Sequence, residues 1–126
     1  MASVAQIQNV VARYVELLSA RQPEKIVDLF AENATIEDPV GTEPKTGRQT
    51  LVDFYTVLAS MEEIAVELLW SKVAADTAVF SFELRSGAGG HRFELRPVDI
   101  MIFDDDAKIV SLRAVFDPAT DIKPLS

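Results

Sequence analysis

Two aspartates and one tyrosine occupy positions where the sequence pattern predicts an apolar environment. Asp99 lies in a run in which every second residue from Phe93 to Phe103 is otherwise apolar, so strand alternation directs its carboxyl group inward. An ionised carboxylate there would lose its hydration, so we expect Asp99 to be protonated at neutral pH and to act as a hydrogen-bond donor. The alternatives are that Asp99 pairs with a buried arginine, caps a backbone group or lies on a frayed edge.

Asp38 and Tyr14 are the other two candidates. Asp38 shares a strand face with Ala34 and Ile36, and Pro39 disfavours helix at this position. Water can reach the loop that follows, so we expect Asp38 to stay ionised and to accept a proton as a general base. Tyr14 lies on the apolar stripe of a first helix, where its hydroxyl needs a partner. Taken singly, such a tyrosine is more often a core residue, and an aspartate before proline more often forms a turn.

Together, Tyr14, Asp38 and Asp99 could carry out enolisation. The base removes a proton next to a carbonyl group, and the two neutral donors stabilise negative charge on the oxygen, at about 3 kcal/mol for a well-placed donor. Polar groups that converge on an apolar interior are typical of a small-molecule site. The residues expected to contact the substrate are Leu18, Phe54, Tyr55, Phe82, Met101, Leu112 and Phe116. Some of these would be ordinary core residues in any domain of this size.

The candidate residues must be positioned by helices in the first half of the chain and strands in the second. A Ser3–Gln6 capping box and apolar residues at helical spacing predict helices over residues 4–21, 23–33 and 49–60. Alternating patterns predict strands over residues 34–38, 64–70, 78–84, 93–103 and 110–116. An irregular loop is expected from Val40 to Gly47, and turns are expected at Ser86–Gly90 and Asp104–Asp106.

This order predicts a single α+β domain over residues 1–126. The later strands form a meander whose apolar face is covered by the helices, and a sheet curled around helices leaves a pocket. The chain has 126 residues, of which 48% are hydrophobic and 25% charged, in keeping with one modest core.

Composition narrows the classes of partner and chemistry. A net charge of -8 disfavours nucleic acid and anionic membranes, so we expect a neutral or apolar ligand. The absence of cysteine excludes disulfides, thiol nucleophiles and cysteine-ligated metals, and His91 is the one possible centre of a Ser-His-Asp triad. The Asp104–Asp106 run lacks the spaced ligands of an EF-hand loop, so we predict no metal site. No signal peptide or membrane span is recognisable, which makes the cytoplasm the expected location.

Several short motifs, spread over nearly the whole chain, carry a resemblance to a known family. They are Ala12-Arg13-Tyr14-Val15, Ile36-Glu37-Asp38-Pro39-Val40-Gly41, Glu43-Pro44 with Gly47, Phe54-Tyr55, Pro97-Val98-Asp99, and Ser111-Leu112-Arg113-Ala114 before Phe116. With these motifs the sequence resembles the bacterial Δ5-3-ketosteroid isomerases of the nuclear transport factor 2-like (NTF2-like), or SnoaL-like, superfamily.

The resemblance implies a cone-shaped fold, with a curved mixed or antiparallel sheet wrapped around three N-terminal helices. It implies that Asp38 moves a proton from C4 to C6 of a 3-oxo-Δ5 steroid while Tyr14 and protonated Asp99 bind the C3 oxygen, a division of roles known for this family. No cofactor is then needed, and Tyr55 lies near Tyr14. Some relatives carry another tyrosine where this chain has Phe30, and the resemblance leads us to expect a small residue where this chain has Arg96.

The resemblance further implies a homodimer, formed through the outer sheet face that carries Val98, Ile100 and Ile102. Two other functions stay open. One is a non-catalytic protein that binds a steroid or another flat apolar ligand, or a purely structural dimer. The other is a different enzyme of the superfamily, such as an epoxide hydrolase or cyclase, in which Asp38 activates water or another carbon acid. The hydrolase or cyclase predicts a more polar pocket with Glu94 or Arg96 turned inward, which strand parity argues against.

Overall fold

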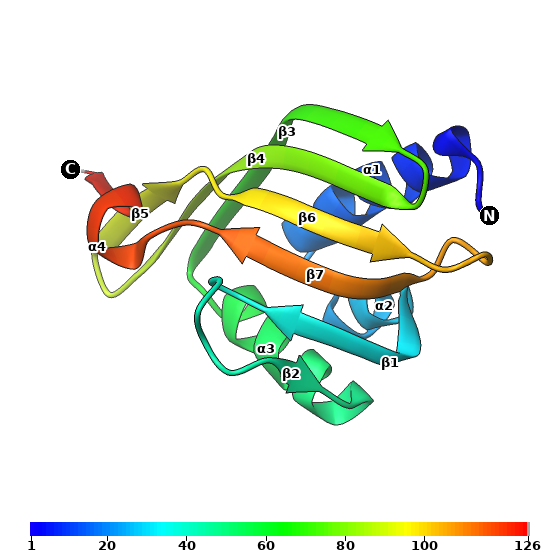
Figure 1. The fold of residues 1–126 in the computed structure, drawn as a ribbon. Coiled ribbons are helices and arrows are strands. Elements are labelled where there is room, and N and C mark those ends of the chain that lie inside the picture. Colours follow the sequence, from blue (N-terminus) through cyan, green and yellow to red (C-terminus); the bar gives the residue numbers. More distant parts are fainter. Residues whose placement is uncertain (126) are drawn as a thin grey trace.

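The computed structural model describes residues 1–125, which form helices packed on one face of a curved sheet (Figure 1). The helices are α1 (Val4–Ser19), α2 (Pro23–Val27), α3 (Arg48–Ala59) and α4 (Pro118–Asp121). The strands are β1 (Phe30–Glu37), β2 (Lys45–Thr46), β3 (Glu63–Ala74), β4 (Thr77–Ala88), β5 (His91–Leu95), β6 (Val98–Phe103), β7 (Ile109–Val115) and β8 (Lys123–Leu125). This arrangement confirms the predicted α+β class.

The sheet is mixed and branches at β4. One edge of β4 pairs with β3 along its length, and the other pairs first with β6 and then with β5. Beyond β6, the sheet continues through antiparallel β7, parallel β1 and antiparallel β2, while β5 continues into antiparallel β8. The predicted meander of the later strands is confirmed, because β3, β4, β6 and β7 pair antiparallel in chain order. The parallel β1–β7 pair, which joins the first strand to the last long one, makes the sheet mixed.

The long strand predicted over residues 93–103 is interrupted at Arg96 and Pro97, between β5 and β6. Proline lacks the backbone N–H that a ladder needs, and the Pro97 carbonyl accepts a hydrogen bond from the Ser81 hydroxyl at 2.7 Å. Side chains still alternate between the two faces across this interruption, because β5 and β6 pair with β4 in one register. Ser81 pairs with Val98, and Leu84 pairs with Leu95.

The second predicted helix is also wrong at its end. Helix α2 stops at Val27 rather than near Asn33, and β1 begins at Phe30. Phe30 pairs with Ile109, and a register irregularity separates it from the regular pairing that begins at Thr35. Tertiary pairing with β7 thus overrides the local apolar pattern of these residues. The short elements β2, α4 and β8 had no periodic signal in the sequence.

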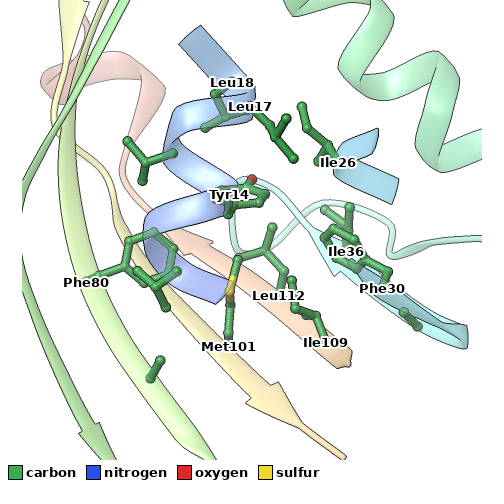
Figure 2. Packing of buried hydrophobic residues seen from close by; sticks show 14 of the residues in the cluster. Tyr14, Leu17, Leu18, Ile26, Phe30, Ile36, Phe80, Met101, Ile109 and Leu112 are labelled. Atoms are coloured by element: carbon green, nitrogen blue, oxygen red, sulfur yellow. The ribbon is translucent and has the colours of Figure 1, made fainter. Parts of the chain in front are cut away.

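The core lies between the inner face of the sheet and helix α1. The predicted capping box is present, with Gln6 N–H donating to the Ser3 hydroxyl at 3.1 Å and Ser3 N–H to the Gln6 side chain at 2.8 Å. Figure 2 shows Tyr14 of this helix above Leu112 and Met101, which come from two adjacent strands of the sheet. Within residues 1–125, no helix is both long and apolar enough to cross a membrane.

Candidate active site

A cavity of about 430 Å³ opens between the inner face of the sheet and helices α1 and α3. Tyr14, Asp38 and Asp99 all line it, so the structure brings the three predicted residues together. The apolar lining consists of Leu18, Pro39, Phe54, Val57, Leu58, Met61, Phe82, Leu84, Phe93, Leu95, Pro97, Phe116 and Ile122. The cavity is an apolar chamber with a few polar groups, the usual character of a small-molecule site.

Asp99 lies in the middle of the sheet, between Phe80 of β4 and Ala114 of β7, and is 2% exposed. Its Oδ1 atom has no hydrogen-bond partner among residues 1–125. Burial raises the pKa of Asp99 well above its usual value, and the nearby charge of Asp38 raises it further. The protonated, neutral form of Asp99 is therefore favoured, and this form can donate a hydrogen bond. Asp99 does not lie on a frayed edge, and in the described part of the chain its Oδ1 atom has no buried arginine as a partner.

Asp38 directly follows β1 and is more accessible than Asp99. Burial raises its pKa to about 6, and the positive charge of Lys45 opposes the rise. A carboxyl group with this pKa is mostly ionised at pH 7 yet basic enough to accept a proton, as a general base requires. The two carboxyl groups thus differ in favoured protonation state within one cavity.

The loop that carries Asp38 is fixed on both sides. Val40 N–H donates to the Ala114 carbonyl at 2.8 Å, and Gly41 N–H donates to the Glu37 carboxylate at 2.9 Å. The same carboxylate accepts a hydrogen bond from Arg113 Nε at 2.8 Å. These contacts tie the loop to β7, the strand next to Asp99.

Tyr14 and Tyr55 form a buried pair with 2.8 Å between their hydroxyl oxygens. Burial raises the pKa of Tyr14 well above its usual value, and its charged form is disfavoured further by Tyr55 and Asp99. When Tyr55 donates to Tyr14, the Tyr14 proton is available to a ligand in the cavity. Phe30 and Phe80 pack edge-on against Tyr14, with ring centroids 6.5 and 6.1 Å away, and restrict its ring.

The structure places five of the seven predicted contact residues in the cavity lining: Leu18, Phe54, Tyr55, Phe82 and Phe116. The other two, Met101 and Leu112, are not part of it. They are 0% and 1% exposed and pack in the core beneath α1 (Figure 2). Met101 lies two residues beyond Asp99 along β6, a step of about 7 Å, which carries it past the lined region.

Several lining residues were missed by sequence reasoning. Phe93, Leu95 and Pro97 lie on the Asp99 stripe, and its parity was a sufficient signal for them. Val57 lies in the last turn of α3, Met61 lies just after that helix, and Ile122 lies just after α4. Only the tertiary arrangement brings these three residues to the cavity.

The charged residues between the stripe positions point outward, as parity predicts. Arg96 forms an ion pair with Glu83 at 2.7 Å, and Arg85 bridges Glu83 and Glu94 at 2.9 and 3.2 Å. Neither Glu94 nor Arg96 lines the cavity. Asp38 and Asp99 are its two carboxyl groups, and residues 1–125 contain no cluster of three potential metal ligands.

A helix-covered curved sheet that encloses an apolar cavity with two unlike carboxyl groups defines a class of small-ligand α+β domains. The model of the SnoaL-like domain matches residues 11–112, and the chain belongs to this NTF2-like family. A steroid Delta-isomerase from Nocardioides simplex is 38% identical over 114 residues, which cover 90% of this chain and 92% of the relative.

Among solved structures, the epoxide hydrolase/cyclase-like enzyme SalBIII, described for pyran ring formation in polyether salinomycin, superimposes with a TM-score of 0.90. The match covers 99% of this chain and 100% of that one, at 24% sequence identity. At this identity the likeness concerns the fold alone, and it confirms the cone-shaped α+β architecture.

Proposed function

We propose that this protein is a steroid Δ-isomerase that converts 3-oxo-Δ5 steroids into 3-oxo-Δ4 steroids. The observation that carries the proposal is the pair of carboxyl groups in one apolar cavity, of which Asp38 favours the ionised form at neutral pH and Asp99 the protonated form. Similarity to a steroid Delta-isomerase over 90% of the chain supports it. The substrate would be a small apolar molecule, in keeping with the cavity lining.

In the proposed reaction Asp38 removes a proton from C4 of the substrate. The electron pair of the broken C–H bond forms the C3=C4 double bond, and the carbonyl electrons move onto the C3 oxygen. The hydroxyl group of Tyr14 and the protonated carboxyl group of Asp99 donate hydrogen bonds to that oxygen. Asp38 then returns the proton to C6, the double bond moves from C5–C6 to C4–C5, and the carbonyl group re-forms.

The environment of each residue suits its proposed role. Asp99 carries no competing bond at Oδ1, so a ligand oxygen gives this atom a partner that residues 1–125 do not supply. The Tyr55 hydroxyl orients Tyr14. The low polarity of the cavity strengthens both donor bonds as charge develops on the oxygen. We propose no organic cofactor or metal for this reaction, and the cytoplasmic location stays a prediction from the sequence.

The test is to incubate the purified protein with a 3-oxo-Δ5 steroid and follow the conjugated enone product by ultraviolet absorbance. We expect enone formation well above the buffer rate at micromolar protein. A steroidal phenol, which resembles the dienolate, should bind and inhibit. Binding of the phenol without any enone formation would instead support a non-catalytic ligand-binding protein, and loss of both would argue against a steroid site.

A further inference from the structure

One long wall of the cavity starts at Asp99 and follows the curved sheet. Strand β4 holds β5 and β6 in one register across Pro97, so Phe93, Leu95, Pro97 and Asp99 lie in line on the inner face, and all four line the cavity. Six residues of extended chain separate the ends of this line, a distance of about 20 Å at roughly 3.3 Å per residue. The four fused rings of a steroid, built from carbon–carbon bonds of roughly 1.5 Å, reach about half of that.

A second groove continues the wall at the end remote from Asp99. It has a volume of about 300 Å³ and shares Phe93 and Ile122 with the cavity. Its remaining lining is Gly90, His91, Arg92, Pro124 and Leu125, from the β4–β5 turn, β5 and β8. Phe93 and Pro124 are partners in the β5–β8 ladder, so the C-terminal strand widens the surface that the cavity wall begins.

The character of this distal groove favours an apolar ligand. Phe93, Ile122, Pro124 and Leu125 supply carbon surface. The cation of the groove, Arg92, is already neutralised, because its guanidinium group donates to the Glu63 carboxylate at 2.6 and 2.9 Å. An anionic substituent would have to break this bidentate ion pair, whereas an alkyl chain would only displace water from the apolar side chains.

We propose that the distal groove binds an alkyl side chain on ring D of the substrate, so that the preferred substrates are 3-oxo-Δ5 steroids that carry such a chain at C17. This inference rests on the proposed function. With the C3 oxygen at Tyr14 and Asp99, the rings lie along the first half of the wall, so C17 lies near Leu95 and before Phe93 and Ile122. A chain at C17 then continues past these two residues into the groove.

The test compares kcat/KM for cholest-5-en-3-one, which has a branched alkyl chain at C17, with that for androst-5-ene-3,17-dione, which has none. His91→Trp fills the groove from its exposed edge, and Leu125→Ala removes part of its wall. Val4→Trp, a change at an exposed aliphatic residue at the start of α1, is the matched control. Calorimetry with the corresponding 3-oxo-Δ4 steroids gives the same comparison without turnover.

We expect the native protein to prefer the long-chain substrate at least tenfold in kcat/KM. His91→Trp and Leu125→Ala should each lower the long-to-short ratio at least fivefold, and Val4→Trp should leave it within twofold of the native value. An equal or reversed preference in the native protein, or a ratio that neither groove variant changes, would overturn the inference while leaving the isomerase proposal intact. If neither steroid were isomerised, the proposed function would fail, and the calorimetric ratio would still decide the role of the groove.

Discussion

Asp38 and Asp99 show how position alone gives two identical side chains opposite chemistry. Asp99 lies mid-strand in the sheet and is buried, whereas Asp38 lies where β1 ends and its loop admits water. Desolvation raises the pKa of both carboxyl groups, but Lys45 opposes the rise only at Asp38.

Both the inward direction of Asp99 and the wetter position of Asp38 were predictable from strand parity and from Pro39. The Tyr14–Tyr55 hydrogen bond was expected only through family resemblance, because residues 41 positions apart meet only through the tertiary fold.

At the residue scale, Asp99→Leu should lower kcat by roughly 100-fold, the usual cost of losing one oxyanion donor. The variant keeps Tyr14 as the remaining donor and keeps a similar side-chain volume. Steady-state kinetics on a 3-oxo-Δ5 steroid checks this, with Asp105→Asn, at a solvent-exposed turn, as the control. A kcat equal to that of the parent would remove Asp99 from the proposed mechanism.

The pH dependence of the reaction should report Asp38. Its pKa is raised to about 6, and the base must be ionised, so activity is lost as the pH falls below 6 and is retained above it. We expect kcat/KM to rise about tenfold per pH unit up to pH 6 and to level off near pH 7. A profile that is flat or falling between pH 5 and pH 7 would contradict the assignment of Asp38 as base.

At the element scale, a single arginine holds the end of α3 against the end of α1. Arg21 has a left-handed backbone, with φ of 58°, just after α1. Its guanidinium group donates to the Ala59 carbonyl at 2.9 Å, to the Met61 carbonyl and to the Glu62 carbonyl at 3.3 Å. Positive charge at the end of a helix is also favourable. The α3 wall of the cavity, which includes Met61, is therefore positioned from α1.

We expect Arg21→Met to raise KM for the steroid severalfold while changing kcat much less, because the wall loosens but the reacting groups stay in place. Loss of these partly buried hydrogen bonds should also lower the free energy of unfolding by about 1–2 kcal/mol. Kinetics and urea denaturation measure the two effects. Arg13→Met, at an exposed i,i+3 ion pair, is the control. A proportional fall in kcat with unchanged KM would argue against this positioning role.

The elements themselves differ in how far they could be predicted from sequence. Helix α1 and the strands with clear alternation follow from periodicity, since their apolar residues repeat at 3.6 or 2 positions. The α2–β1 boundary does not, because Phe30 is in a strand only by virtue of its pairing with Ile109. The placement of Arg21 against α3 depends on how two helices meet, which no local pattern encodes.

At the scale of the whole molecule, the outer face of the sheet is the surface that the helices leave uncovered. Val98, Ile100 and Ile102 are half-buried on this face, and Val115 is 45% exposed. A twofold pairing of this face would bury these side chains, and for this reason we still predict a homodimer. The cone shape and the enclosed cavity could be predicted only in outline. The cavity is lined by residues that are far apart in the sequence, from Tyr14 to Ile122, and only the tertiary fold brings them together.

Ile100→Arg should convert the expected dimer into a monomer, because it places a second positive charge beside its cross-strand partner Arg113 on the face expected to be buried. Sedimentation velocity at micromolar concentration compares it with the parent and with Val4→Arg, a charge added at an exposed site on α1. A parent protein that sediments as a monomer would rule out dimerisation through this face.

In the proposed mechanism Asp38 transfers the proton, and Tyr14 and Asp99 stabilise the enolate that forms in the cavity. The most direct measurement is the rate of enone formation from a 3-oxo-Δ5 steroid by the parent, by Asp38→Asn and by the control Asp105→Asn, together with the affinity of each for a steroidal phenol. We predict that Asp38→Asn loses most of the rate but still binds the phenol, and that Asp105→Asn matches the parent. An Asp38→Asn variant as active as the parent would contradict the account.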